Sequence, residues 1–171
     1  RGLGDVYKRQ GSFDPAHKGH LAISKEGKKR FKLEKIIWAI TKKNPLKAES
    51  KTPISKKIKD CKKIIGLNSF IKVKFYENII KSNKTIDLIN YLKKNKNIEI
   101  FFLMGADNLI SFHKWHKSKL ISQKCNIIVF DRHGYKKNSL KSKTFKRLNN
   151  KTLTFIEFKK VNISSSQLRK I

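Results

Sequence analysis

The sequence predicts an α/β fold with a doubly wound parallel sheet in a single domain. Short strand-like apolar runs alternate along the chain with segments in which apolar residues recur every three or four positions. One of these runs, residues 99–104, is apolar at every position after Glu99, which suits a strand buried on both faces. The length of 171 residues is that of one domain. In such a sheet, ligands bind at the carboxyl ends of the strands.

Five strands and three helices follow from these patterns. The helical segments carry apolar residues at helical spacing, and Pro53 suits the first turn of a helix. The expected strands are residues 36–40, 71–75, 98–104, 126–130 and 153–158, and the expected helices are residues 53–65, 85–94 and 139–148.

The first ten residues do not fit this alternation. They hold two of the six Arg and two of the eight Gly, and residues 5–10 are too polar for a typical central strand. Two interpretations remain open: a foreign segment such as a linker, or a poorly hydrophobic first strand whose neighbours compensate. We expect the domain itself to comprise residues 11–171, with its last helix truncated.

The charge is strongly basic, with 42 Lys and Arg against 12 Asp and Glu and a formal net charge of +30. Such a charge suggests a nucleic acid or a membrane surface as partner. However, only six of the basic residues are Arg, and the Lys are spread along the whole chain. We therefore interpret most of the charge as solvated surface, with a positive field that helps to attract polyphosphate substrates.

Cysteine content and hydropathy indicate a cytoplasmic protein without a membrane partner. Cys61 and Cys125 lie far apart and lack metal-binding spacing, so we expect buried thiols in a reducing compartment. No apolar run approaches the roughly 20 residues of a membrane helix.

Residues 11–20, Gly-Ser-Phe-Asp-Pro-Ala-His-Lys-Gly-His, form the most informative segment. Gly11 allows a phosphate to approach the backbone, and a helix start adds unpaired N–H groups for the same anion. His17 and His20 are three residues apart, which places both imidazoles on one face of a helix. A lone His pair at this spacing is more often structural or metal-binding; with the turn before it, we favour a phosphate cradle and expect no metal held by the protein.

This segment resembles the (T/S)FDPxHxGH signature of the nucleotidyltransferase superfamily that includes the class I aminoacyl-tRNA synthetases, which implies a Rossmann-like sheet. A second segment, residues 163–169, resembles the ISSTxxR motif of the same superfamily, with Ser166 where Thr is common. A hydroxyl-rich helix start followed by Arg169 suits the outer phosphates of a triphosphate. Alone, it would be interpreted as an ordinary Ser helix cap.

Further segments resemble those of the bacterial nicotinate-nucleotide adenylyltransferases. Residues 104–109 are similar to their MGxDxL segment and are followed by Trp115, which on the sequence alone could equally be a core residue. The other similar segments are residues 44–47, 84–87 and 131–135. The resemblance covers residues 11–171 and departs from the family at Gln10, where Gly is usual, and at the end of the chain, where a further helix usually follows.

The resemblance implies adenylyl transfer from ATP to nicotinate mononucleotide, giving nicotinate adenine dinucleotide and pyrophosphate in NAD biosynthesis, with Mg²⁺ accompanying ATP. It implies His17 and His20 as catalytic residues. The implied ATP-binding residues are these two and Gly11, Ser12, Phe13, Gly105, Asp107, Ile163, Ser164, Ser165 and Arg169. The implied pyridine-nucleotide-binding residues are Asn44, Lys47, Thr85, Trp115, His116 and Arg132.

Two alternatives stay open. A phosphopantetheine adenylyltransferase would share both signature motifs, although Trp115 and residues 44–47 argue against it. A basic nucleic-acid-binding module would rest on the charge alone, and the aromatic residues show no arrangement typical of RNA recognition. We expect no specific nucleic-acid partner and leave open a monomer or a homo-oligomer.

Overall fold

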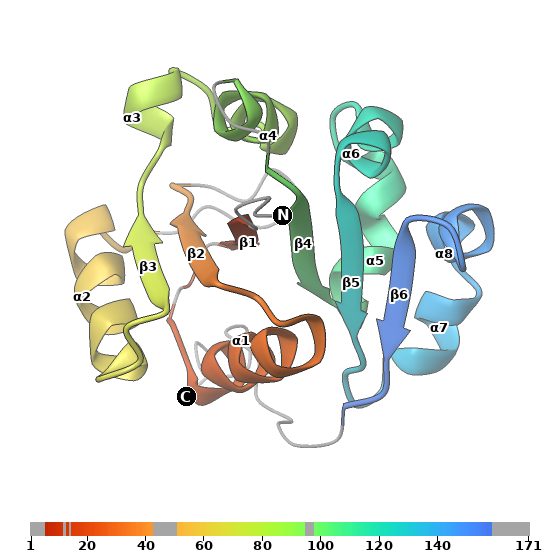
Figure 1. Cartoon of the computed structure of the whole chain (residues 1–171), viewed down its shortest axis with the longest axis horizontal. Helices are drawn as coiled ribbons and strands as arrows, with labels where there is room; N and C mark the ends of the chain where they lie inside the picture. Colours follow the sequence, from red (N-terminus) through yellow and green to blue (C-terminus); the bar gives the residue numbers. More distant parts are fainter. Residues whose placement is uncertain (1–5, 12, 14, 43–50, 95–97, 159–171) are drawn as a thin grey trace.

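The sheet contains six parallel strands in the order β3-β2-β1-β4-β5-β6 (Figure 1). The computed structural model describes residues 6–11, 13, 15–42, 51–94 and 98–158. The strands are β1 Val6–Gly11, β2 Lys35–Ile40, β3 Ile71–Lys74, β4 Ile100–Gly105, β5 Asn126–Phe130 and β6 Leu153–Ile156. All five predicted strands are present, and the doubly wound α/β fold is confirmed.

The polar segment near the amino terminus forms β1, a central strand. It pairs with β2 from Val6 opposite Lys35 to Gly11 opposite Ile40, and it pairs with β4 on its other edge. The expectation that residues 5–10 are too polar for a central strand is therefore wrong for residues 6–10. Backbone hydrogen bonds on both edges do not depend on side-chain polarity, and the neighbouring strands are apolar and largely buried.

Two of the three ranges predicted as helices are present, and the third is divided near residue 140; the described chain also contains helices outside those ranges. The longer ones are α1 Lys18–Phe31, α2 Ile54–Ile65 and α4 Thr85–Lys93, and the short ones are α3 Glu77–Ile80, α5 Ala106–Ser111, η1 Phe112–Lys114, α6 Ser118–Lys124, α7 Lys136–Leu140 and α8 Lys143–Leu148. The prediction of one helix over residues 139–148 is wrong, because the chain makes two. Ser142 separates them, and its hydroxyl accepts a hydrogen bond from the Phe145 N–H at 3.1 Å, so it caps α8.

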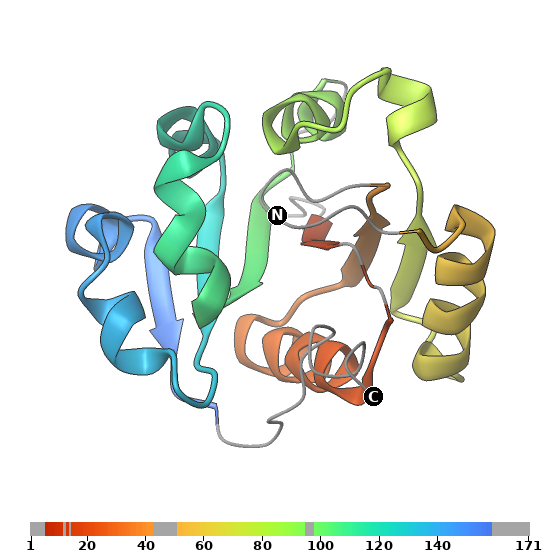
Figure 2. The same ribbon diagram turned by 180° about the vertical axis from the view of Figure 1, so that it is seen from behind.

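Helices cover both faces of the sheet (Figures 1 and 2). Alternate residues of β2 show the division: Ile36 and Trp38 pack in one core with α1 and α2, whereas Ile37 packs against α4. The second large core contains residues of α4, α5, α6 and α8. The covering helices change face where the chain passes from β3 to β4, so β1 lies at the switch point of the sheet.

The two strands at the switch point are paired over only part of their length. Six residue pairs join β1 to β2, but only three join β1 to β4, ending at Lys8 opposite Phe102. Both strands continue for three more residues, to Gly11 and Gly105. The carboxyl ends of β1 and β4 are therefore not paired with each other. A doubly wound sheet binds its ligand at this place.

Candidate active site

The histidine pair forms the start of α1, as the spacing predicts. His17 is the N-cap residue, and its Nδ1 accepts a hydrogen bond from the Gly19 N–H at 3.1 Å. The Nδ1 of His20 accepts one from the His17 N–H, also at 3.1 Å, which completes a reciprocal capping arrangement. The rings stack with centroids 3.8 Å apart, and the residues are only 7% and 9% exposed.

These hydrogen bonds determine which ring nitrogen bears hydrogen. A nitrogen that accepts from a backbone N–H must present its lone pair, so each Nδ1 is unprotonated and each neutral ring carries its hydrogen on Nε2. Two imidazole N–H donors are thus held side by side at a helix amino terminus, where the unpaired backbone N–H groups also favour an anion. This arrangement suits phosphate oxygens.

Two aromatic side chains, Phe13 and Trp38, pack against His20. Phe13 lies 4.8 Å from His20 and stacks on Trp38 of β2, with ring centroids 5.0 Å apart and an interplanar angle of 20°. Trp38 also meets His20 edge-on at 5.9 Å. The Trp38 indole N–H donates to the Ser24 hydroxyl at 2.9 Å, and that hydroxyl donates to the His20 carbonyl at 2.9 Å.

Sequence reasoning did not identify Trp38 and Ser24. A signal was available, because a Trp within a strand that reads as buried needs a hydrogen-bond partner for its indole N–H. The partner lies 14 residues earlier in the chain, and only the packing of α1 on β2 shows which residue it is.

Phe13 adopts a backbone conformation that is rare for a bulky residue. Its φ is 44°, in the left-handed region, and its side chain is almost completely buried. Such a conformation persists only where the surroundings enforce it, and it is concentrated at functional sites. Here it lies between the end of β1 and the histidine pair.

A second polar group lies at the carboxyl ends of β4 and β5. Asp107, in the first turn of α5, pairs with Arg132 just after β5, and the Arg132 Nη1 to Asp107 Oδ2 distance is 2.6 Å. The other carboxylate oxygen, Oδ1, is buried and has no hydrogen-bond partner among the described residues. Buried polar atoms in proteins usually have a hydrogen-bond partner, so this oxygen is an acceptor with unused capacity.

Gly105 is necessary for the placement of that carboxylate. A Cβ atom at Gly105 would lie 2.6 Å from Asp107 Oδ1, closer than real Cβ contacts allow. The resemblance implies that Gly105 binds ATP; the structure adds that this glycine makes room for Asp107. The structure also shows that Asp107 and Arg132 form an ion pair, although the resemblance assigns them to different substrates.

Three predicted pyridine-binding residues lie around the second core. Trp115 is half-buried and packs edge-on against Phe102, with ring centroids 5.9 Å apart. This contact agrees with the interpretation of Trp115 as a core residue. Thr85 is buried at the first position of α4, next to Ile86 of the same core, and His116 is exposed. Trp115 thus contacts the core and remains partly exposed.

Seven predicted site residues lie outside the described part of the chain. They are Ser12, Asn44, Lys47, Ile163, Ser164, Ser165 and Arg169. The expected convergence of the histidines with residues 164–169 on one triphosphate therefore stays a prediction.

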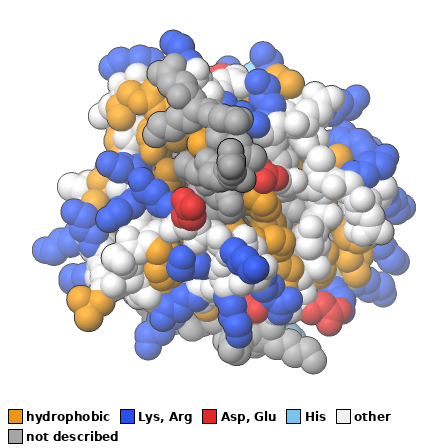
Figure 3. Space-filling view, in the orientation of Figure 1, with side chains coloured by type: hydrophobic (Ala, Val, Ile, Leu, Met, Phe, Trp, Pro, Cys, Tyr) orange, Lys and Arg blue, Asp and Glu red, His pale blue; other side chains and the backbone are white. Residues whose placement is uncertain are grey.

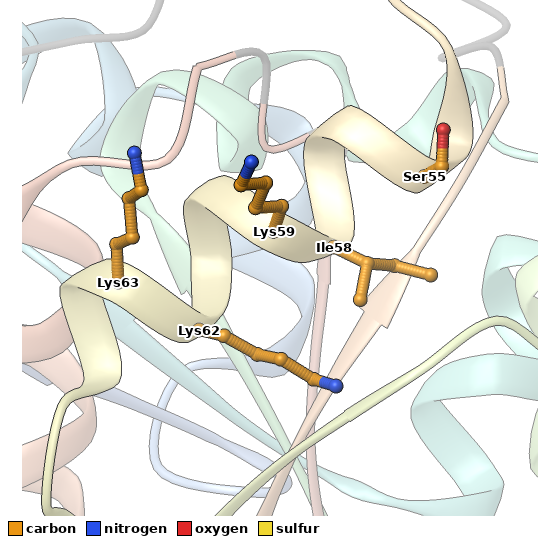
Figure 4. A pocket seen from close by; sticks show the side chains of 5 residues that line it. All are labelled: Ser55, Ile58, Lys59, Lys62 and Lys63. Carbon is orange, nitrogen blue, oxygen red and sulfur yellow. The ribbon is translucent and has the colours of Figure 1, made fainter.

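Elsewhere on the surface, a shallow depression on α2 is lined by lysines. Its residues are Ser55, Ile58, Lys59, Lys62 and Lys63. Figure 4 shows that the ammonium groups do not converge on one point, since Lys59 and Lys63 point to one side and Lys62 to another. On the face shown in Figure 3, the Lys and Arg side chains are likewise spread around the molecule, which agrees with a solvated basic surface.

Within the described ranges, no three His, Cys, Asp or Glu side chains are grouped so that they could hold a metal ion. Both cysteines are buried free thiols, as predicted. None of the described helices combines the length and apolar character needed to cross a bilayer.

Comparisons with known proteins show the family of this chain. Residues 10–171 match the model of the cytidylyltransferase-like family. The "Probable nicotinate-nucleotide adenylyltransferase" of Pelagibacter ubique (strain HTCC1062) is 67% identical over 161 residues, covering 94% of this chain and 89% of that protein. The chain belongs to the nicotinate-nucleotide adenylyltransferase family.

Other members of the nicotinate-nucleotide adenylyltransferase family are more distant. The "Probable nicotinate-nucleotide adenylyltransferase" of Clostridium botulinum (strain Eklund 17B / Type B) is 33% identical over 164 residues, covering 94% of this chain and 82% of that protein. The structure of Plasmodium falciparum nicotinic acid mononucleotide adenylyltransferase complexed with NaAD superimposes with a TM-score of 0.75 at 23% identity, covering 97% of this chain and 82% of that one. This structural likeness shows the same fold, and membership of the family confirms that the chain is a nucleotidyltransferase.

Proposed function

We propose that this chain transfers the adenylyl group of ATP to nicotinate mononucleotide, forming nicotinate adenine dinucleotide and pyrophosphate. The observation that carries the proposal is the stacked His17 and His20 pair, held with both Nε2–H donors at a helix start beside the switch point of the sheet. Membership of a family whose relatives are named for this reaction supports the same conclusion.

The reaction needs alignment and charge stabilisation more than acid–base chemistry. An oxygen of the mononucleotide 5′-phosphate attacks the α-phosphorus of ATP in line, and the bond to the bridging oxygen of pyrophosphate breaks. A phosphate monoester is already anionic near neutral pH, so no general base is needed and no covalent enzyme intermediate forms. His17 and His20 donate through Nε2 to the oxygens that gain charge at the α-phosphate and at the leaving group.

The other predicted residues bind the two substrates. Asp107 Oδ1, buried without a partner in the described chain, accepts from a ribose hydroxyl of ATP, while Arg132 holds the carboxylate in place. Trp115 offers its ring to the pyridine. Contacts to ATP from Ser12 and residues 163–169, and contacts to the pyridine mononucleotide from Asn44 and Lys47, complete the proposal.

Mg²⁺ belongs to this proposal as a companion of the ATP phosphates. Mg²⁺ in nucleotide-dependent enzymes is held largely by substrate phosphates and water, with few protein ligands. The described residues fit that mode, because they group no set of metal-binding side chains while they do provide donors for phosphate. When bound, the ion would neutralise charge on the phosphate oxygens. The cytoplasmic location expected from the sequence stays a prediction.

The first test replaces His20. With ATP and nicotinate mononucleotide as substrates and pyrophosphate release as the measurement, His20→Ala should lower kcat by about a hundredfold, as expected for the loss of one preorganised donor. Far-ultraviolet circular dichroism should show the wild-type fold. His113→Ala, at an exposed residue of η1, is the matched control and should keep wild-type kcat. Near-normal turnover of His20→Ala would refute the role of the pair.

The second test compares acceptors. Nicotinate mononucleotide, nicotinamide mononucleotide and phosphopantetheine are supplied in parallel with ATP, and pyrophosphate is measured in each. We expect a large preference for the nicotinate form, because donors matched to a carboxylate would be mispaired by an amide. Preferential use of phosphopantetheine would contradict the proposed acceptor.

A further inference from the structure

A buried hydrogen-bonded chain joins the central sheet to the first turn of α1. The Trp38 indole N–H donates to Ser24 Oγ, which donates in turn to the His20 carbonyl, each over 2.9 Å. Ser24 and Trp38 are both fully buried. A helical Ser commonly bonds the carbonyl four residues earlier, and by itself that bond is unremarkable. Here the same hydroxyl also accepts a hydrogen bond from the Trp38 side chain of β2. It therefore acts as donor within α1 and as acceptor from β2.

The ring of Trp38 makes a second, independent connection to the same site. Its face stacks on Phe13, which has the left-handed φ of 44° and also packs against His20. One side chain of β2 therefore supports both the turn before the histidines and the helix that carries them. A rotation of α1 about its axis would disturb the Trp38 to Ser24 hydrogen bond and the ring contacts together.

We propose that Trp38 and Ser24 are positioning residues that fix the rotation of α1 and thereby the placement of the His20 imidazole. The proposal rests on the proposed function for its catalytic consequence. His20 must lie so that its Nδ1 reaches the His17 N–H, because this bond keeps the Nε2 hydrogen directed away from the helix backbone. Ser24→Ala removes the hydroxyl and keeps the Trp38 ring on Phe13, whereas Trp38→Phe removes the indole N–H and also replaces the ring by a smaller one; both release this constraint.

The consequence for catalysis should exceed the consequence for folding. Small displacements of a catalytic group lower turnover strongly, while binding of the distant parts of the substrates is little affected. We expect Trp38→Phe and Ser24→Ala each to lower kcat about tenfold, with KM for both substrates within about twofold of wild type. Since both act through one chain, the double variant should be no slower than the slower single variant.

Ser122 provides a matched control. It is a buried helical Ser whose hydroxyl donates to a backbone carbonyl of its own helix, Lys119 O, at 2.7 Å, and it lies on α6, away from the histidines. Ser122→Ala should lower the thermal midpoint less than Ser24→Ala, because only Ser24→Ala also leaves the buried Trp38 indole N–H without its acceptor, and it should leave kcat unchanged. If kcat falls in all variants in proportion to the decrease in thermal midpoint, the hydrogen-bonded chain has only a structural role. That result would overturn the proposal.

A spectroscopic measurement separates this proposal from the proposed reaction. In the substrate-free chain, ¹⁵N signals of the His17 and His20 rings should show one tautomer, with hydrogen on Nε2. Trp38→Phe and Ser24→Ala should shift the His20 ring signals, and Ser122→Ala should not. If wild type makes no dinucleotide but these shifts occur, the proposed function fails and the positioning role stands. Wild-type ring signals together with wild-type kcat in both variants would overturn the positioning role.

Discussion

At the residue scale, the Asp107 to Arg132 pair depends on Gly105, because this glycine leaves room for the Asp107 carboxylate. Gly105→Ala would place a methyl group 2.6 Å from Asp107 Oδ1, so the carboxylate must move away from its buried position. We expect KM for ATP to rise about tenfold, as for loss of one charge-assisted hydrogen bond. Asp107→Asn should give a similar rise, measured by initial rates at varied ATP.

An exposed ion pair offers the control for this prediction. Lys136 and Glu157 form a pair at the surface, where such pairs contribute little. Glu157→Gln should leave KM for ATP unchanged. A wild-type KM in Gly105→Ala would mean that the carboxylate position is unimportant for nucleotide binding.

Cys61 gives the folded state a pH dependence on the alkaline side. Burial raises the pKa of its thiol from 9.0 to about 12, and the neighbouring Asp60 carboxylate adds to the rise. The unfolded chain loses this proton above pH 9 while the folded chain keeps it, so the thiol lowers the free energy of unfolding as pH rises from 9 to 12. The slope reaches at most about 1.4 kcal/mol per pH unit.

The measurement is urea unfolding at several pH values for the wild type and Cys61→Ala. The variant should be less stable at neutral pH, because it leaves a small cavity, but its stability should fall less steeply above pH 9. Parallel slopes for the two proteins would contradict the assignment of this effect to Cys61.

At the element scale, the start of α1 combines helix capping with catalysis in one side chain. His17→Ala removes the cap and should cost about 1 kcal/mol of stability as well as activity. His17→Asn keeps a good capping group but has no Nε2–H, so it should unfold near the wild-type midpoint and still lose activity. Thermal unfolding and pyrophosphate release, measured on both variants, separate the two roles; equal stability of the two variants would argue against the cap.

The elements that sequence patterns predicted well are those whose signals are local. The run at residues 126–130 is β5, and the helix expected over residues 53–65 begins one residue later as α2. The segment over residues 139–148 was misjudged because apolar spacing continues through the break that Ser142 makes. The composition of residues 5–10 does not predict the strand β1, because this strand is stabilised by backbone pairing on both edges, and composition does not reveal such pairing.

The same distinction holds for the site. His17 and His20 lie within one turn, so their spacing alone predicted their proximity. The Trp38 to Ser24 bond and the Asp107 to Arg132 pair join residues 14 and 25 positions apart. Both depend on how helices and strands pack, and the sequence pattern offered only the separate residues.

At the scale of the whole molecule, the net charge of +30 opposes compaction. Self-repulsion among the surface cations destabilises the folded chain, and salt reduces it, because the screening length falls from about 30 Å at 0.01 M to about 8 Å at 0.15 M. We expect the thermal midpoint to rise by several degrees over this range, similarly for sodium chloride and potassium chloride. A midpoint that is flat or falls would show that the charges are already balanced locally.

The place of β1 between β2 and β4 also sets an order of events during protein synthesis. The histidine segment leaves the ribosome before residues 100–105, and β1 can acquire its second neighbour only after those residues have been made. The Arg132 that pairs with Asp107 follows later still. A nascent chain that has emerged only as far as β3 thus carries the signature histidines next to an unpaired strand edge, which is a target for chaperones and for association with other chains.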